Sequence, residues 1–510
     1  MSGRARVVWS AATGVIASLA TLGVAEIVAV FVAPGASPLF AVGSFVIDIV
    51  PPWFKDLAIA LFGTADKIAL FVGLGLLVLV LAALVGVLEF RRPPWGSLLL
   101  GAVGAVTVVI AVTRAGADAS WALPTVVGAV AGVIVLRAAR TRLEPWAVDE
   151  APSAFDRRDF LRFGGITAAL GLAAAIGGRM INAGTAAVDS VRQAIALPKP
   201  ATVSAPIPAG AELDIPGISD LVTANDVFYR IDTALQVPVV DALSWRLRVT
   251  GMVEREVEIG YEELLAKPLT ESTVTLMCVS NEVGGGLVGT ATWLGWPIRE
   301  LLEQARPLPG ADMVLSRSID GFTAGTPLEV LLEADRDSLL AVGMNGEALP
   351  IEHGFPVRMV VPGLYGYVSA TKWVVELKVT TFAKDQGYWT PRGWDALGTV
   401  KTSSRIDVPR SGDSVPAGKV AVAGVAWAQH RGIRGMEVRV DDGPWQPARL
   451  AEAISSDTWV QWVYEWDAAP GAHVVAVRAT DIAGETQSGN RVPPAPNGSE
   501  GWHTITVNVG

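Results

Sequence analysis

The residue with the most distinctive chemistry is the single cysteine of the 510-residue chain, Cys278. It stands in "TLMCVSNEVGGG", between an apolar run typical of a buried strand and a glycine cluster. A thiolate is a soft ligand that suits transition metals, whereas a lone cysteine is more often a small buried hydrophobe. On this segment alone the buried hydrophobe is the favoured interpretation. One cysteine also excludes any disulfide within the chain.

Two later segments contain side chains that can bind an anion. "HGFPVR" holds His353 and Arg358, and "SATKW" holds Lys372. Arginine suits phosphate because its planar fork donates two hydrogen bonds at once. Taken singly, Arg358 would be a charge on a strand surface and His353 a turn residue.

These residues lie in a part of the chain where strand-like and helical segments alternate, residues 225–390, which predicts an α+β domain. Within it, Asn345-Gly346 between apolar flanks predicts a hairpin turn. Residues 391–510 consist of alternating strands separated by Gly, Pro and Asp turns, which predicts an all-β immunoglobulin-like domain without paired cysteines. A polar, tryptophan-containing bridge at 386–404 joins the two, and a Pro/Ala-rich linker, 191–224, precedes them.

The N-terminal part is much more apolar than the rest. A spanning helix needs about 20 mostly apolar residues. Five stretches qualify: 9–33, 67–90, 97–113, 119–137 and 164–185. We therefore expect a membrane domain of about four helices at 1–148 and a final anchor helix within 149–190. The apolar stretch 38–62 is broken by prolines and charges, so we expect it to lie in the membrane interface, with a re-entrant or sixth span as the alternative.

Arginines next to the predicted spans indicate the orientation. All of them fall on one side if the N-terminus is cytoplasmic and five helices cross the membrane. They are Arg4, Arg6, Arg91, Arg92, Arg137, Arg140, Arg142, Arg157, Arg158 and Arg162. The sequence therefore predicts a multi-pass protein of the cell membrane whose globular part lies outside the cytoplasm.

The segment "DRRDFL" before the fifth span resembles a twin-arginine export signal, which serves proteins that fold in the cytoplasm. Arg157 and Arg158 are followed by Phe and Leu at the positions typical of that signal. The alternative is a pair of ordinary arginines on the cytoplasmic side. No small-residue cleavage site is obvious after Arg179, so we expect the helix to stay as an anchor.

Composition excludes other partners. The net charge of −10 argues against nucleic acid, because phosphate binding needs clustered Lys and Arg. The four histidines all lie beyond the predicted spans and no CxxCH occurs, so no haem is predicted. Glu26 is the one ionisable residue deep in an apolar run, which makes it a functional candidate; pairing near the outer interface is the alternative.

With this layout established, residues from about 220 to 510 resemble the sulfite oxidase family of molybdopterin-dependent oxidoreductases. The matching segments are "NDVFYRIDTALQVP", "TLMCVSNEVGG", "ATWLGWPIRELL" and "MNGEALPIEHGFPVRMVVPGLYGYVSATKW". The resemblance implies that Cys278 binds the molybdenum of a molybdopterin cofactor. It also implies that the C-terminal domain is a dimerisation domain, and hence a homodimer.

The resemblance assigns further cofactor contacts by motif position. The residues are Asn225, Phe228, Tyr229, His353, Arg358, Ser369, Thr371 and Lys372. The first three would contact the pterin ring, and His353 and Arg358 its phosphate. Lys372 and the backbone of residues 369–371 would make additional contacts.

The chain departs from the family pattern where sulfite oxidases bind their anionic substrate. Val283 stands where an arginine is expected, and Phe322 where a tyrosine is expected. Arg230 would restore one positive charge, whereas Glu282 would disfavour an anion. Fewer donors weaken the binding of an oxyanion, so sulfite is less favoured as the substrate. The glycines at 284–286 either open the pocket or form a flexible loop.

Two functions are consistent with these features. The first is a membrane-anchored molybdenum oxidoreductase that transfers an oxygen atom on a small-molecule substrate and exchanges electrons with a separate carrier, a quinone or a cytochrome. Within this class, oxidation of a sulfur compound competes with reduction of an S- or N-oxide. The second is a non-catalytic, membrane-anchored binding module with an immunoglobulin-like domain. It leaves the cysteine and the export signal unexplained.

Overall fold

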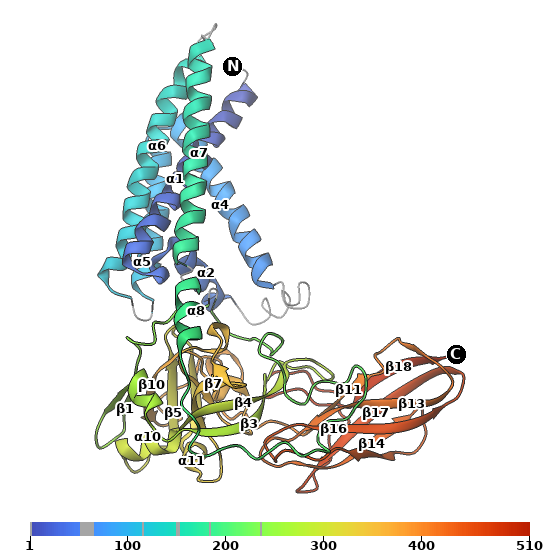
Figure 1. Ribbon diagram of the computed structural model, residues 1–510. Helices are drawn as coiled ribbons and strands as arrows, with labels where there is room; N and C mark the ends of the chain where they lie inside the picture. The colour runs from blue at the N-terminus through green and yellow to red at the C-terminus, as the bar shows by residue number, and fades with distance from the viewer. Residues whose placement is uncertain (1–2, 51–65, 115–116, 149–153, 183–184, 235–236) are drawn as a thin grey trace. The chain divides into compact units, whose positions relative to one another are not determined.

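The protein is described by a computed structural model that covers residues 3–50, 66–114, 117–148, 154–182, 185–234 and 237–510. The chain forms two compact units, which are described separately. One comprises Met1–Thr185 with Ala234–Val237, and the other Ala186–Thr233 with Pro238–Gly510. Figure 1 shows the first unit as helical and the second as rich in strands.

The N-terminal unit is built from long apolar helices. They are α1 (Gly3–Val32), α2 (Pro38–Ile49), α4 (Asp66–Arg91), α5 (Trp95–Val112), α6 (Ala122–Val148) and α7 (Ala154–Asn182). In the described part of the chain, five segments are long and apolar enough to cross a membrane: Arg4–Val32, Val72–Arg91, Trp95–Val112, Ala119–Glu144 and Arg158–Gly177. They coincide with the five predicted spans and indicate membrane association.

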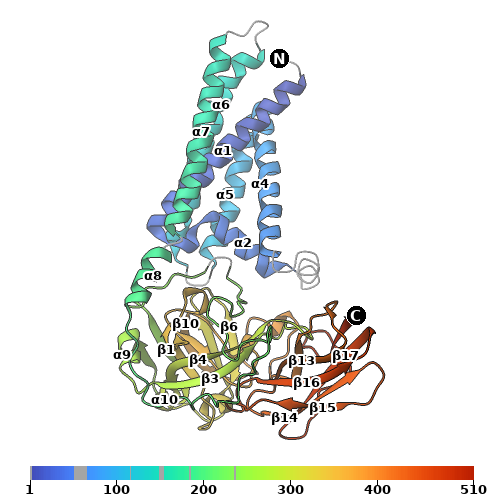
Figure 2. The same ribbon diagram turned by 45° about the vertical axis from the view of Figure 1, so that its right-hand side comes forward.

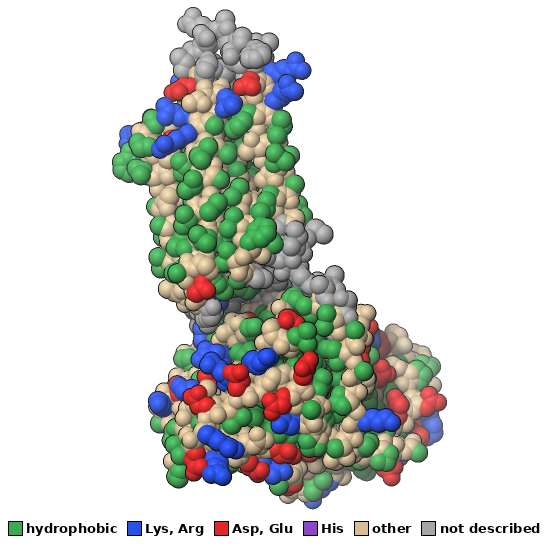
Figure 3. Space-filling view, turned by 60° about the vertical axis from the view of Figure 1, so that its left-hand side comes forward, with side chains coloured by type: hydrophobic (Ala, Val, Ile, Leu, Met, Phe, Trp, Pro, Cys, Tyr) green, Lys and Arg blue, Asp and Glu red, His purple; other side chains and the backbone are tan. Residues whose placement is uncertain are grey.

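Side chains on the outside of this unit are suited to lipid. Figure 3 shows hydrophobic side chains along its flanks and charged ones near its ends. Val80 and Leu170, for example, are 64% and 66% exposed. Of the stretch 38–62, the first part forms the twelve-residue helix α2, whose N-cap is Ser37; the prolines and charges that break the stretch lie outside the described residues.

Helix α1 packs against α4, α6 and α7 through small residues. A Cβ on Gly14 would collide with the Ala82 carbonyl oxygen of α4, and one on Gly23 with the backbone of Gly171 in α7. Small residues let membrane helices approach closely, which maximises van der Waals contact where lipid provides no hydrophobic driving force. Glu26 is buried in α1, and the Ser37 hydroxyl donates a hydrogen bond to its carboxylate at 2.5 Å.

The second unit begins with α8 (Thr185–Ala194) and an extended segment. The expected linker, 191–224, is packed rather than free along part of its length. The backbone N–H of Leu213 donates to the Gln461 side chain at 2.6 Å, and the Trp459 indole donates to the carbonyl of Leu221 at 2.8 Å.

Two five-stranded sheets form the α+β part that the sequence predicts (Figure 2). The first has the order β2 (Val257–Gly260), β1 (Arg246–Gly251), β10 (Val374–Thr380), β5 (Met313–Ser318), β6 (Thr323–Pro327). The second has the order β3 (Thr270–Met277), β4 (Val288–Pro297), β7 (Leu339–Met344), β8 (Glu347–Ala348), with β9 (Arg358–Val360) paired to β7. Short helices α9 (Tyr261–Leu265), α10 (Ile298–Ala305) and α11 (Leu328–Leu332) connect strands. The predicted hairpin at Asn345-Gly346 joins β7 to β8, and both turn residues have positive φ.

The C-terminal part is all-β, as predicted. Its strands pair in the order β11 (Ser403–Val408), β13 (Gly418–Trp427), β16 (Val460–Ala468), β15 (Gln446–Leu450), β14 (Ile433–Val440), β17 (Gly471–Asp481), β18 (His503–Val509), β12 (Ser414–Val415). Its assignment as immunoglobulin-like stays a prediction.

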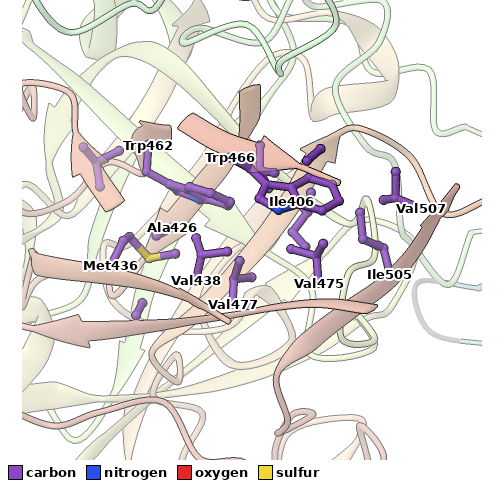
Figure 4. Close-up of a cluster of buried hydrophobic side chains, with 14 of the residues drawn as sticks. Ile406, Ala426, Met436, Val438, Trp462, Trp466, Val475, Val477, Ile505 and Val507 are labelled. Atoms are coloured by element: carbon purple, nitrogen blue, oxygen red, sulfur yellow. The ribbon is translucent and has the colours of Figure 1, made fainter. Parts of the chain in front are cut away.

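Alternate residues of these strands point into one apolar core. Figure 4 shows Trp462 and Trp466 of β16 facing Val438 of β14 and Val475 and Val477 of β17. Trp462 is fully buried. Because side chains alternate along a strand, every second residue lies on the buried face of the sheet. Burial of these apolar side chains is the main source of stability for such a sheet.

Replacing Trp462 by alanine should therefore destabilise this part by about 3–5 kcal/mol, the usual cost of truncating a buried tryptophan. The measurement is the thermal unfolding of the purified protein. Val474→Ala, at a neighbouring site that is 45% exposed, is the matched control and should change the unfolding temperature little. Equal effects of the two substitutions would contradict the assigned core.

Candidate functional site

One pocket of the second unit contains most of the residues that the sequence analysis selected. It encloses about 930 Å³ of space outside the protein atoms, its open mouth included. The lining comes from five parts of the chain: 228–233, 278–280, 318–322, 353–373 and the bridge residues Trp389 and Trp394. Strands of both five-stranded sheets therefore end at, or lead into, the pocket.

Cys278 follows directly after β3, whose last six residues are buried. Its backbone N–H donates to the carbonyl of Leu287 at 3.0 Å, and its carbonyl accepts from Asn281 at 3.1 Å. The side chain lines the pocket and is 9% exposed. Burial raises the pKa of the Cys278 thiol, and hydrogen bonds from Ser280 oppose that shift. A bound metal cation would favour the thiolate instead.

The turn after the cysteine is anchored from the side facing away from the pocket. Asn281 is buried, its side-chain oxygen accepts from the backbone of Leu287 at 2.7 Å, and its carbonyl accepts from the Ser499 hydroxyl at 2.7 Å. Arg405 donates to the carbonyl of Gly285 at 2.8 Å. The C-terminal part therefore fixes the backbone that presents the thiol.

The glycine run does not open the pocket. Residues 284–286 are outside the lining. Gly284 has φ +80, and a Cβ there would meet the imidazole of His503. The run thus allows a close approach between the cysteine turn and β18.

Arg358 supplies a buried positive charge to the pocket. It is 6% exposed, and burial lowers the pKa of its guanidinium to about 10, so it stays charged at neutral pH. Its hydrogen bonds go to the carbonyls of Met359 (3.3 Å) and His353 (3.1 Å), and it stacks on Trp293. Among the described residues, no carboxylate lies within ion-pair distance of Arg358. The guanidinium therefore retains capacity for an anion.

Two further basic side chains border Arg358. Lys372 is 9% exposed, and burial lowers the pKa of its ammonium to about 8, opposed by an ion pair with Asp232 at 2.8 Å. Burial beside Arg358 lowers the pKa of His353 to about 4, so its imidazole is neutral at pH 7. The Nε2 of His353 lies 3.0 Å from the carbonyl oxygen of Asn225.

Aromatic rings line the same pocket as the thiol and the cations. Phe228 and Tyr229 stack at 5.2 Å between ring centroids, and His353 meets Phe228 edge-on at 5.6 Å. Burial raises the pKa of Tyr229, whose phenol interacts electrostatically with both Cys278 and Arg358. These rings therefore offer a flat ligand a contact surface in the pocket that also holds the thiol and the guanidinium.

Comparison with known proteins agrees with this geometry. The family described as "Oxidoreductase molybdopterin binding domain" matches residues 234–389. Sulfite oxidase of Gallus gallus is 32% identical over 270 residues, which cover 45% of this chain and 58% of that protein. Sulfite oxidase of Arabidopsis thaliana is 26% identical over 358 residues, 58% of this chain and 90% of that protein. These matches support the sulfite oxidase family of molybdopterin-dependent oxidoreductases as the family of this chain.

A solved structure extends the likeness to the fold. The sulfane dehydrogenase SoxCD of Paracoccus pantotrophus matches with a TM-score of 0.50 at 21% identity, covering 57% of this chain and 84% of that chain. The chain spans 58% and 62% of the length of the chicken and mouse sulfite oxidases.

The molybdopterin-binding domain match and the similarity to sulfite oxidases imply a molybdenum–molybdopterin cofactor, and the pocket fits that group. The lining offers a soft sulfur donor in Cys278, a buried cation in Arg358 that has no carboxylate partner in the described part of the chain, and the stacked rings of Phe228 and Tyr229. A molybdenum ion, a phosphate and a pterin ring require these three kinds of contact.

The structure brings together seven of the residues that the sequence analysis selected. Those that line the pocket are Phe228, Tyr229, Cys278, Phe322, His353, Arg358 and Lys372. The other four, Asn225, Arg230, Ser369 and Thr371, lie outside the lining. The roles of all of them stay predictions.

The residues outside the lining support those within it. Asn225 accepts from the Asn345 side chain at 2.8 Å and donates to Glu347 at 2.6 Å. Ser369 and Thr371 are fully buried, and their hydroxyls bond to the Tyr365 carbonyl and the Ser316 hydroxyl at 2.9 and 2.7 Å. Arg230 is exposed and pairs with Asp232 at 2.8 Å.

The expected surroundings of the metal position need correction at two residues. Glu282 is exposed, and neither Glu282 nor Val283 lines the pocket. The carboxylates of the lining are instead Asp232 and Asp320. The turn anchored by Asn281 directs residues 282–286 away from the pocket, which sequence spacing could not reveal.

Sequence reasoning also missed Tyr367, Trp389 and Trp394, which line the pocket. The two tryptophans belong to the bridge at 386–404, which was interpreted only as a connection between domains. Two tryptophans and a tyrosine within "YWTPRGW" form an aromatic cluster that could have indicated a binding surface.

The buried neutral His353 predicts a loss of stability in acid. Between pH 6.5, its ordinary pKa, and about 4, the unfolded chain binds a proton that the folded chain does not. The contribution of His353 to the free energy of unfolding is therefore fully present above pH 6.5. As the pH falls from 6.5 toward 4, the free energy of unfolding decreases by up to about 1.4 kcal/mol per pH unit. Melting temperatures of His353→Gln between pH 4.5 and 7.5 should show a shallower acid slope than those of the parent.

His473→Gln provides the control, because a hydrogen bond to Asp441 raises the pKa of that histidine. Its removal should not make the acid slope shallower. The same slope in the parent and in His353→Gln would mean that His353 is accessible to protons in the folded protein.

Proposed function

We propose that this chain is a membrane-anchored, extracytoplasmic molybdenum-cofactor oxidoreductase that transfers an oxygen atom to or from a small sulfur-containing substrate. The observation that supports it best is that one pocket holds both the Cys278 thiol and the buried charge of Arg358, which has no carboxylate partner among the residues that the structure describes. A cofactor with a metal at one end and a phosphate at the other accounts for both.

Each type of contact in the pocket would have a defined task in this function. Cys278 would ligate molybdenum, Arg358 and Lys372 would hold the phosphate, and Phe228 and Tyr229 would pack on the pterin. When bound, the cofactor supplies two-electron oxygen-atom transfer. The protein orients it, because the thiol is set on an anchored turn, and limits water around it, because the thiol and both cations are buried.

A separate electron carrier, a quinone or a cytochrome, would complete the reaction. Each histidine is already engaged within the second unit: His353 with Asn225, His430 with Asp457, His473 with Asp441 and His503 with Ile406. Since these residues lie outside the five candidate spans, the spans would not hold haem through histidine.

The domain organisation belongs to the same proposal. Residues 1–148 would form the membrane domain, 149–190 the twin-arginine segment and last anchor, and 225–390 the catalytic domain. Residues 391–510 would form an immunoglobulin-like dimerisation domain. With the N-terminus in the cytoplasm, the catalytic domain would face outward.

The competing function, a non-catalytic binding module, is less well supported. It would explain apolar helices and a β-rich C-terminal part, but it gives no reason for a buried guanidinium facing a pocket that also contains the single thiol. Metal analysis of protein purified from a cofactor-producing host separates the two. About one molybdenum per chain supports the enzyme, and none supports the module.

Cys278→Ser should abolish turnover with artificial electron donors and acceptors while the protein stays folded. We expect a loss of more than about 100-fold, because residues that merely orient a metal ligand already contribute 10–100-fold. Turnover is measured beside the melting temperature and the molybdenum content. Unchanged turnover would refute the assignment of Cys278 as the metal ligand.

Replacing Arg157 and Arg158 together by lysine should prevent the second unit from reaching the outer side. A twin-arginine signal depends on the arginine pair, whereas ordinary topology depends only on positive charge. Protease accessibility in spheroplasts measures the outcome. Arg91 and Arg92 replaced together by lysine are the matched control and should leave export intact; equal export of both variants would contradict the signal.

A further inference from the structure

Four aromatic side chains of the pocket lining form a connected cluster. We call Phe322, Tyr367, Trp389 and Trp394 the aromatic wall; all four line the pocket. Tyr388 connects them, with ring centroids 5.9 Å from Phe322 and 5.2 Å from Trp389. Trp394 lies 6.2 Å from Trp389 and 5.9 Å from Tyr367. These spacings are typical of aromatic pairs in contact.

The aromatic wall is held in place by hydrogen bonds. The hydroxyl of Tyr367 donates to the carbonyl of Asp395 at 2.9 Å, and the backbone N–H of Phe322 donates to Asp320 at 3.1 Å. Arg392 lies 3.7 Å above the Tyr388 ring and donates to its carbonyl at 2.6 Å. The rings therefore form a preorganised surface, which reduces the entropy lost when a ligand binds.

Charges in the pocket disfavour an anion next to this wall. In the described part of the chain, the cations of the lining are Arg358 and Lys372, which the cofactor phosphate would occupy. His353 is neutral at pH 7. The carboxylate of Asp232 is paired with Lys372 and Arg230, and Asp320 contributes a second carboxylate to the lining. An anionic substrate would lose its hydration without gaining an opposite charge, which is costly.

Apolar surface continues outside the wall. Ile231 lines the pocket and is 51% exposed, and Ile319, next to Asp320, is 48% exposed. Leu397 is 59% exposed, and its carbonyl accepts from Tyr367 at 3.4 Å. A substrate with an apolar group beside its reacting atom can cover this rim while the reacting atom points inward.

From this combination we infer that the substrate is an uncharged sulfoxide, or the corresponding thioether, whose sulfur bears an apolar or aromatic group. The inference rests on the proposed function and specifies its substrate class. In the reductive direction the S–O bond breaks, sulfur gains two electrons, and the oxygen leaves as water with two protons. The two electrons come from a one-electron donor, which is reduced viologen in the assay below. In the oxidative direction water supplies the oxygen and an acceptor takes the electrons.

The test uses the detergent-solubilised, molybdenum-loaded full chain and two probes of similar shape. Methyl phenyl sulfoxide and benzenesulfinate share the ring and the sulfur–oxygen bond, but the second has an anionic oxygen in place of the methyl group. We expect turnover of the sulfoxide and, by ligand-observed NMR, at least about tenfold weaker binding of the sulfinate. Equal or tighter binding of the sulfinate, or turnover of sulfite without turnover of the sulfoxide, would overturn the inference.

Substitutions in the aromatic wall identify the surface that recognises the substrate. Trp389→Ala and Trp394→Ala should each raise both KM and the NMR dissociation constant for the sulfoxide roughly three- to tenfold, the effect of losing one aromatic contact. The kcat value should stay within about twofold, and Trp394→Phe should be intermediate. Trp445→Ala, in the C-terminal part and outside the lining, is the matched control. A fall in kcat at constant KM, or no change in either, would contradict a role in substrate recognition.

Removing a negative charge gives the opposite test. Asp320→Asn keeps an acceptor oxygen for the Phe322 backbone but should strengthen sulfinate binding; unchanged binding would contradict the charge argument.

The molybdenum content of the purified protein distinguishes a failure of this inference from a failure of the proposed function. Protein without molybdenum refutes both, whereas loaded protein that turns over only anions refutes the substrate class alone.

Discussion

Burial of the Arg358 guanidinium is the constraint on which the candidate site depends. Removing a charge from water costs several kcal/mol unless other groups compensate. Here two backbone carbonyls and the face of Trp293 compensate in part. Lys372, by contrast, already has Asp232 as its counter-ion. The pocket therefore contains one neutralised cation and one that still requires an anion, and a phosphate at this place would satisfy it.

The position of the Cys278 thiol also depends on contacts between the α+β part and the C-terminal part. The α+β part supplies the pocket, but strands of the C-terminal part hold the backbone on which Cys278 stands. Gln429 donates to the carbonyl of Thr275 at 3.3 Å, and the Thr275 hydroxyl accepts from the backbone of Trp459 at 2.7 Å. The Trp427 indole donates to the sulfur of Met277 at 3.0 Å. Since β3 is restrained from this side up to the residue before Cys278, the position of the thiol is set by both parts.

The helices of the N-terminal unit are held together by close packing rather than by the burial of apolar surface. Lipid-facing surfaces gain nothing from burying apolar groups, so its helices approach through Gly14 and Gly23, where small size permits backbone contact. Glu26 is an exception to the apolar pattern, and its hydrogen bond to Ser37 shows how the fold accommodates it. The sequence already predicted five spans here because hydropathy over about 20 residues is a local property.

Local patterns thus determined the spans, the alternation of the C-terminal strands, the Asn345-Gly346 turn and, through ordered motifs, the resemblance to the family and seven residues of the pocket lining. They failed where distant segments meet. Glu282 and Val283 lie outside the pocket because the turn that holds them is anchored at Asn281. The carbonyl of Asn281 accepts a hydrogen bond from Ser499, which is more than 200 positions away in the chain. The pairing of Lys372 with Asp232 and the aromatic wall from Phe322 to Trp394 likewise join residues far apart in the chain. Periodicity and motif spacing encode which face of an element is buried, but only the tertiary structure decides which side chains converge, because that choice depends on packing between elements rather than within them.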